Sequence, residues 1–302
     1  MKLKCVKENN FKEFSFGESG IVKNGRYYLP SAFPYFEDKD FRAFTDKTFE
    51  KRTELLNEVF FGKDEIKPPL NIPEDYEIIK LSDELYSADF TGGEHSVIKD
   101  FVPYQGEENG MLRIISYVGI FFSIYADMAD GGEIENGEEL DYAVPAELPE
   151  AVIAGFIAKF CGLKIGKILL CKDGFETFRS AAVFKAESGV ISDVINDFYE
   201  DYDYLLSPVT AGCVYSWDNC ESNSKTVIID AISPFIYARE VYAALSGKSE
   251  KDFIKAAKKL SFETAGQLPS SIGEAGKIRD EFEKDMISMK VLCNIYSVLK
   301  DY

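Results

Sequence analysis

The chain has 302 residues, of which 46% are hydrophobic and 14% aromatic, so it can bury a large core in one or two domains. Its 34 lysines and arginines are outnumbered by 52 aspartates and glutamates, which gives a formal net charge of −18. A surface with this charge repels nucleic-acid phosphates and anionic lipids, so we expect no nucleic acid and no membrane among its partners. The N-terminus lacks the apolar region of a signal peptide, and the most apolar stretch, residues 114–126, is shorter than a bilayer span. The expected location is therefore the cytoplasm.

The cysteines and the single histidine exclude several kinds of site. No C-x-x-C pair occurs, which argues against a structural zinc site, and we expect no metal. One histidine, His95, cannot build a Ser-His-Asp triad or a multi-histidine metal site. It lies four residues before Lys99, which leaves open both a catalytic role and a purely local hydrogen bond in a turn. The acidic stretches 127–141 and 198–204 lack EF-hand spacing and are interpreted as solvated loops. The six cysteines are Cys5, Cys161, Cys171, Cys213, Cys220 and Cys293.

The first part of the chain contains an amphipathic helix and a linker. Apolar residues recur at helical intervals over residues 41–61, with charged residues between them. The run Lys67-Pro-Pro-Leu-Asn-Ile-Pro73 then interrupts any helix. We therefore place a boundary near residue 75, with an N-terminal segment over residues 1–75 and an α/β domain over residues 76–302.

The second part alternates strands with helices. Residues 140–144 are typical of a buried strand, 150–160 of a helix that ends at Gly162, and 167–171 of a second strand. Together they predict a βαβ unit of a parallel sheet. The predicted fold class is α/β, a mainly parallel sheet with flanking helices. The other expected elements are strands at 77–81 and 227–230, helices at 111–128, 190–203, 234–246, 249–259 and 274–299, and a hairpin insert at 208–226.

Two segments far apart in the chain resemble the same family. One reads Gly92-Gly-Glu-His-Ser-Val-Ile-Lys99-Asp-Phe101 after a strand, and the other reads strand, Pro145, helix and Gly162-Leu-Lys-Ile165. In this order they are similar to threonine synthases, which are pyridoxal phosphate (PLP) enzymes of fold type II. Asn24-Gly-Arg-Tyr-Tyr-Leu-Pro30 also resembles the opening of that family.

The resemblance implies a fold and a set of roles. The fold is that of the large domain of fold type II PLP enzymes. Lys99 stands at the position of the lysine that holds PLP as a Schiff base. Thr264 lies in a segment similar to one whose hydroxyl meets the pyridine nitrogen. Arg113 and Arg239 lie in segments that resemble the family and are candidate contacts for an anion or another ligand.

The chain departs from the family where the cofactor phosphate should bind. The glycine-rich turn that points N–H groups at the phosphate is replaced by Ala146-Glu147-Leu148-Pro149-Glu150. Pro149 has no N–H to donate to a phosphate. A phosphate charge and a glutamate charge about 5 Å apart repel each other by on the order of 3 kcal/mol at an effective dielectric near 20. We interpret Glu147 and Glu150 as helix-capping residues that replace a phosphate site. Only a short loop joins Asp100 to Arg113, where the family carries its small mobile domain, so we expect that domain to be largely missing.

Three functions follow from these observations. The favoured hypothesis is a shortened, threonine-synthase-like pseudoenzyme without PLP, which binds or scaffolds a protein partner or a small metabolite. The first alternative is an active PLP-dependent lyase that uses Lys99. The second is a non-catalytic protein that binds an amino acid or a similar metabolite through Lys99, Arg113 or Arg239.

Overall fold

The computed structural model describes residues 2–5, 11–13, 28–61 except 42 and 46, 76–91, 110–171, 181–269, 272, 273 and 275. Its centre is a six-stranded sheet with the order β4-β5-β9-β6-β7-β8. Only β4 runs antiparallel to its neighbour, so the prediction of a mainly parallel sheet is confirmed. The strands are β4 (Glu77–Lys80), β5 (Leu85–Asp89), β6 (Leu140–Ala143), β7 (Ile165–Cys171), β8 (Ala181–Phe184) and β9 (Thr226–Asp230).

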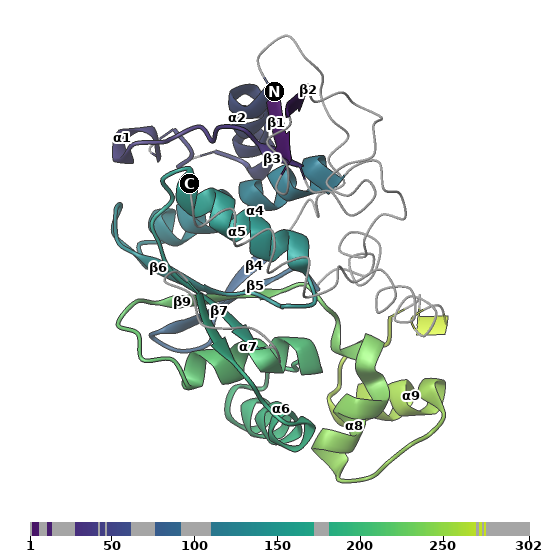
Figure 1. The fold of residues 1–302 in the computed structure, drawn as a ribbon. Coiled ribbons are helices and arrows are strands. Elements are labelled where there is room, and N and C mark those ends of the chain that lie inside the picture. The colour runs from purple at the N-terminus through teal and green to yellow at the C-terminus, as the bar shows by residue number, and fades with distance from the viewer. Residues whose placement is uncertain are drawn as a thin grey trace.

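Helices cover both faces of this sheet (Figure 1). On one face lie α4 (Gly110–Asp130) and α5 (Pro149–Phe160), and on the other lie α6 (Ser188–Tyr202) and α7 (Pro208–Asp218). A strand buried on both faces needs a nearly continuous apolar sequence, and Thr-Val-Ile-Ile-Asp of β9 is buried at every position. The remaining elements are β1 (Lys2–Cys5), β2 (Phe11–Glu13), β3 (Tyr28–Pro30), α1 (Asp38–Phe41), α2 (Phe49–Phe61), the 3-10 helix Pro234–Tyr237, α8 (Ala238–Ser246) and α9 (Phe253–Glu263).

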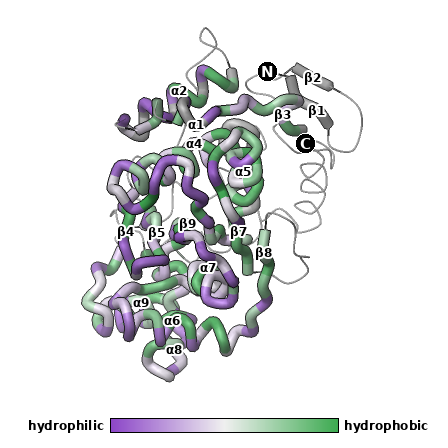
Figure 2. The backbone as a smooth tube through the Cα atoms, turned by 90° about the vertical axis from the view of Figure 1, so that its left-hand side faces the viewer, coloured by the Kyte–Doolittle hydropathy of each residue, from purple (hydrophilic) through white to green (hydrophobic). Residues whose placement is uncertain are grey.

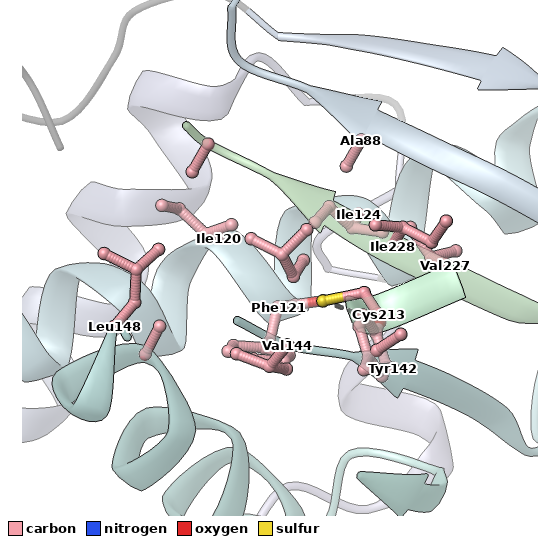
Figure 3. Packing of buried hydrophobic residues seen from close by; sticks show 14 of the residues in the cluster. Ala88, Ile120, Phe121, Ile124, Tyr142, Val144, Leu148, Cys213, Val227 and Ile228 are labelled. Atoms are coloured by element: carbon pink, nitrogen blue, oxygen red, sulfur yellow. Dashed lines mark hydrogen bonds between the residues drawn. The ribbon is translucent and has the colours of Figure 1, made fainter. Parts of the chain in front are cut away.

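The core between the sheet and α4 is built from large side chains (Figure 3). Ile120, Phe121 and Ile124 of α4 lie toward the strands β6 and β9. The Tyr142 hydroxyl is fully buried and donates to the Phe121 carbonyl at 3.1 Å, which satisfies the one polar group that this ring brings into the core. The predicted βαβ unit at 140–171 is thus confirmed and forms the middle of the sheet.

The helix α5 is apolar almost all round because it is covered on both sides (Figure 2). Its inner side approaches β7 so closely that a Cβ at Gly155 would lie 3.0 Å from Ile168. Its outer end is covered by the N-terminal segment, where Phe33 stacks on Phe160. At Gly162, φ is +100° and a Cβ would meet the Phe36 carbonyl oxygen at 2.4 Å, so only glycine fits at this helix exit.

The N-terminal segment is attached to α4 through a buried arginine. The Arg52 side chain, 3% exposed, donates to the carbonyls of Phe44 and Ser123 at 2.7 and 3.0 Å. It also contacts the carboxylates of Asp127 and Asp130 at 2.5 and 3.3 Å. Because a buried guanidinium requires such partners, α2 is held in one orientation on α4.

Three predicted elements differ from the observed ones. The helix predicted at 41–61 is two helices, α1 and α2, separated by a turn at residues 43–45 whose Phe44 carbonyl accepts from Arg52. The hairpin insert predicted at 208–226 is wrong, because residues 208–218 form the helix α7 and only Thr226 belongs to a strand. The helix predicted at 234–246 begins as a 3-10 turn at Pro234 and becomes α-helical at Ala238. The boundary near residue 75 and the helix at 274–299 fall outside the described residues, apart from Ala275.

Candidate functional site

Two aspartates lie side by side at the carboxyl ends of adjacent parallel strands. Asp89 ends β5 and Asp230 ends β9, and the two residues are partners in the register of the sheet. Neighbouring strands are about 4.8 Å apart, and residues in register project to the same face. In open α/β sheets, ligands bind at the carboxyl ends of the strands, so this edge is the candidate site.

Asp230 is buried and accepts hydrogen bonds at both carboxylate oxygens. The Thr210 hydroxyl donates to Oδ1 and the Tyr204 hydroxyl donates to Oδ2, each at 2.8 Å, and the carboxylate also accepts from the Ile232 N–H. Burial, and then the charge of Asp89, raises the pKa of Asp230 to about 7, and these donors oppose the rise without cancelling it. Only 1% of Asp230 is exposed. Its protonation therefore changes in the neutral pH range.

The connection between α6 and α7 and the first turn of α7 supply the two hydroxyl donors. Tyr204 also shares a hydrogen bond of 3.1 Å with the Ser87 hydroxyl on β5, and burial raises the pKa of Tyr204 far above its usual range. Ser207 caps α7, because its Oγ accepts from the Thr210 N–H at 3.1 Å and lies 2.9 Å from the Thr210 hydroxyl. Tyr204 in the connection is thereby hydrogen-bonded to both strands that carry the aspartates, and Thr210 at the start of α7 is hydrogen-bonded to β9.

The turn between β6 and α5 lies at the same edge of the sheet, after the carboxyl end of β6. The N-cap of α5 is Leu148, which makes no side-chain cap, and Pro149 follows in the first turn. The prediction that both glutamates cap this helix is thus corrected. Glu150 lies in the first turn, where its negative charge interacts favourably with the helix dipole, and Glu147 precedes the N-cap. An apolar N-cap followed by proline is stable here because the side chain of Leu148 is buried in the core, 3% exposed.

A buried thiol lies within electrostatic reach of both parts of this edge. Burial raises the pKa of Cys213 on α7, and the charges of Glu147 and Asp230 raise it further. Cys213 is 1% exposed, so we expect its thiol to be unreactive. The charge effects on its pKa come from both carboxylates. Asp89 and Asp230 with the hydroxyls around them, and Glu147 after β6, lie at the same edge of the sheet, and we name them the carboxyl-edge cluster (Asp89, Glu147, Tyr204, Thr210, Asp230).

The residues implied by the resemblance are placed as follows. Lys99 and His95 lie outside the described residues, and Arg113 belongs to the first turn of α4, with its side chain also outside them. Arg239 is exposed on α8. The Thr264 hydroxyl donates to the Leu260 carbonyl at 2.9 Å at the end of α9. Of the turn at 146–150, Ala146 and Leu148 are buried, and Glu147 and Glu150 are half-buried.

The carboxyl-edge cluster was not found from the sequence. Its signal was an acidic residue directly at the end of two hydrophobic strands, in Leu85-Tyr-Ser-Ala-Asp89 and Thr226-Val-Ile-Ile-Asp230. Such a cluster can hold a proton or a positively charged group, but it disfavours a phosphate. Within the described residues, no group of three or more His, Cys, Asp or Glu side chains could hold a metal ion.

The structure is similar to solved threonine synthases. It matches the enzyme from yeast with a TM-score of 0.66 and 12% identity, covering 100% of this chain and 99% of that one. It matches the enzyme from Escherichia coli with a TM-score of 0.63 and 13% identity, covering 89% and 95%. It matches the PLP-bound enzyme from Brucella melitensis with a TM-score of 0.59 and 11% identity, covering 93% and 95%. The chain therefore has a threonine-synthase-like fold.

Similarity at the level of sequence is not detected. No protein-family model matches the chain, and no curated protein matches it significantly.

The helices described in the structure include none that is long and apolar enough to cross a membrane.

Proposed function

We propose that this protein is a threonine-synthase-like pseudoenzyme that no longer binds PLP and acts by binding or scaffolding a partner. The partner is another protein or a small metabolite such as an amino acid. We expect the protein to act in the cytoplasm. Because its formal net charge is −18, we expect neither nucleic acid nor membrane among its partners. The charge at the carboxyl edge of the sheet is the observation that carries this proposal.

A phosphate dianion does not suit the residues at this edge. An anion site at a helix N-terminus needs free N–H groups and backbone that the phosphate can approach. The start of α5 instead has Leu148 at the N-cap, Pro149 without an N–H, and Glu150 in the first turn. Glu147 precedes them and acts electrostatically on Cys213, as Asp230 does. Carboxylates therefore lie in the region where the family places its cofactor phosphate, and these residues do not fit PLP.

The short path between β5 and α4 supports the expectation that the small mobile domain is largely missing. Residues 90–109 alone join the end of β5 to the start of α4. A domain that clamps a substrate needs a longer insertion, because domains rarely have fewer than 50 residues. A chain without this domain keeps the sheet and its edge but lacks the part that closes over a substrate.

An absorbance spectrum tests the loss of PLP binding directly. The protein is incubated with PLP, dialysed and compared with Lys99→Ala and with Lys251→Ala, a change of an exposed lysine that controls for surface imines. We expect no imine band to survive dialysis in any of the three. A band that persists in the wild type and in Lys251→Ala but vanishes in Lys99→Ala would overturn the proposal and restore the lyase that uses Lys99.

A charge-neutral variant tests the reason for the loss. Glu147→Gln/Glu150→Gln keeps the size of both side chains and removes two negative charges from the edge. If charge contributes to the exclusion of phosphate, this variant should bind inorganic phosphate more tightly than the wild type, measured by calorimetry. Thermal-shift screening of amino acids then separates a metabolite-binding protein, whose melting temperature rises, from a scaffold, whose melting temperature does not.

A further inference from the structure

The carboxyl-edge cluster ties a loop to the sheet through a buried carboxylate pair. Tyr204 lies in the connection between α6 and α7, Thr210 lies in the first turn of α7, and both donate to Asp230 on β9. Tyr204 is also hydrogen-bonded to Ser87, two residues before Asp89 on β5. The connection thus depends on Asp230, and Asp230 lies in register with a second carboxylate.

We propose that Asp230 is a proton-dependent latch, which holds residues 203–210 against the sheet while it is protonated and loosens them when it is ionised beside Asp89. This inference concerns the motion of the edge and does not depend on which ligand the edge binds.

The groups around Asp230 offer it hydrogen bonds but no positive charge within the described part of the chain. From β5 it faces the carboxylate of Asp89, and from the α6–α7 connection and α7 it faces the hydroxyls of Tyr204 and Thr210. Its one backbone donor is the Ile232 N–H. The next titratable groups are Cys213 on α7 and Glu147 before α5. The charges of Glu147 and of Cys171 on β7 both raise the pKa of Cys213. Among the described residues, ionisation therefore adds a buried negative charge that no positive group offsets.

The hydrogen-bond chain can adapt to either protonation state while it stays closed. With Asp230 ionised, Tyr204 donates to its carboxylate, and the Ser87 hydroxyl can donate to Tyr204. With Asp230 protonated, its own O–H can donate to Tyr204, whose proton then points to Ser87. Each closed state is thus satisfied in hydrogen bonds, and the cost of the ionised state comes from burial and from Asp89.

Opening removes that cost because water then solvates the carboxylate. The pKa of Asp230 is about 7 in the closed state and returns to about 3.9 when it is exposed, so the population of the open state rises with pH. From these values, the open population increases about tenfold between about pH 6 and pH 8.

Hydrogen–deuterium exchange of the full chain tests this latch. Protection factors corrected for the intrinsic pH dependence are compared at about pH 6 and pH 8 for peptides that cover residues 203–212 and, as an internal reference, α9. We expect protection of residues 203–212 to fall about tenfold in the wild type, and that of α9 to change much less.

Two variants and a control decide the interpretation. Asp230→Asn mimics the protonated acid and should abolish the pH dependence at residues 203–212, whereas Asp193→Asn, an exposed aspartate on α6, should leave it unchanged. Asp89→Asn keeps Asp230 but removes the facing charge, which lowers the pKa of Asp230 in the closed state, so the loosening should level off at a lower pH and be smaller in amplitude. A wild-type segment with pH-independent protection, or an Asp230→Asn protein that loosens as the wild type does, would overturn the latch.

Discussion

Two aspartates on the same face of the sheet have opposite surroundings at its two edges. Asp141 begins β6 at the amino edge, and Asp230 ends β9 at the carboxyl edge. Asp141 accepts from the Lys167 N–H at 2.6 Å and from the Ser222 hydroxyl at 2.5 Å. Burial raises the pKa of Asp141, and these two hydrogen bonds and the side-chain charge of Lys167 oppose the rise. Asp230 accepts hydrogen bonds of similar length from two hydroxyls. The charge that acts on its pKa, however, is the negative charge of Asp89.

The amino edge is therefore a structural edge, where negative charges are matched by lysines. Glu133 shows the same arrangement: it accepts from the Tyr86 hydroxyl at 2.5 Å and lies 3.4 and 3.7 Å from Lys80 and Lys225. At the carboxyl edge the matching charge is missing among the described residues. Proteins tolerate such a mismatch mainly where it serves function, which is why the two edges lead to different expectations.

The largest loss of stability is expected at the amino edge. Asp141→Ala removes the acceptor of a backbone N–H and of a hydroxyl, and leaves the Lys167 N–H without this partner. We expect the free energy of unfolding to fall by about 2–3 kcal/mol, measured by urea denaturation at neutral pH. Asp141→Asn keeps one acceptor oxygen and should lose less than half as much. An alanine variant as stable as the wild type would show that this edge is not held together by Asp141.

The carboxyl edge should respond with the opposite sign. The pKa of Asp230 is raised to about 7 in the folded state, so the folded protein binds more protons than the unfolded chain between about pH 4 and pH 7, and its stability falls as pH rises through that range. Asp230→Asn removes this dependence. At pH 8 it should gain on the order of 4 kcal/mol over the wild type, and at pH 4 close to nothing. Urea denaturation across this pH range, with Asp193→Asn as the control, measures the difference; equal slopes would contradict it.

The donors of the carboxyl-edge cluster can be tested separately. Tyr204→Phe deletes the hydroxyl that contacts both Asp230 and Ser87. We expect a loss of about 1 kcal/mol that is larger at pH 8 than at pH 5, because this hydroxyl stabilises the ionised carboxylate. Combining it with Asp230→Asn should remove the pH-dependent part of the loss. A pH-independent loss in both backgrounds would mean that Tyr204 only packs.

The smallest effect is expected at the start of α5. Glu150→Gln removes a negative charge from the first turn of the helix, so the protein should lose about 0.5 kcal/mol at low salt and almost nothing at 1 M salt. Glu263 ends α9, where a negative charge opposes the helix dipole, so Glu263→Gln should shift stability slightly in the other direction. A gain for Glu150→Gln would show that repulsion within the acidic edge exceeds the dipole term.

Local patterns were enough to predict the elements whose signals lie within a few residues. The buried strand at 140–144, the helix at 150–160 and its exit at Gly162 all match the structure, because hydrophobic periodicity and a left-handed glycine act over short distances. The same patterns missed β5, β8 and the helix α7. Ser207-Pro208 was a usable helix start signal, but the polar run at residues 219–224 was read as the tip of a hairpin.

The sequence by itself determined the fold class, the resemblance to threonine synthases and the acidic turn at 146–150. Only the tertiary structure decided that Asp89 and Asp230 would meet, because pairing between parallel strands joins segments that are far apart in the chain and carries no local signal. It also decided that Asp141 would be matched by Lys167 while Asp230 faces another carboxylate. The charge of a buried group depends on its neighbours in space, and those neighbours come from strands and helices that assemble only in the folded chain.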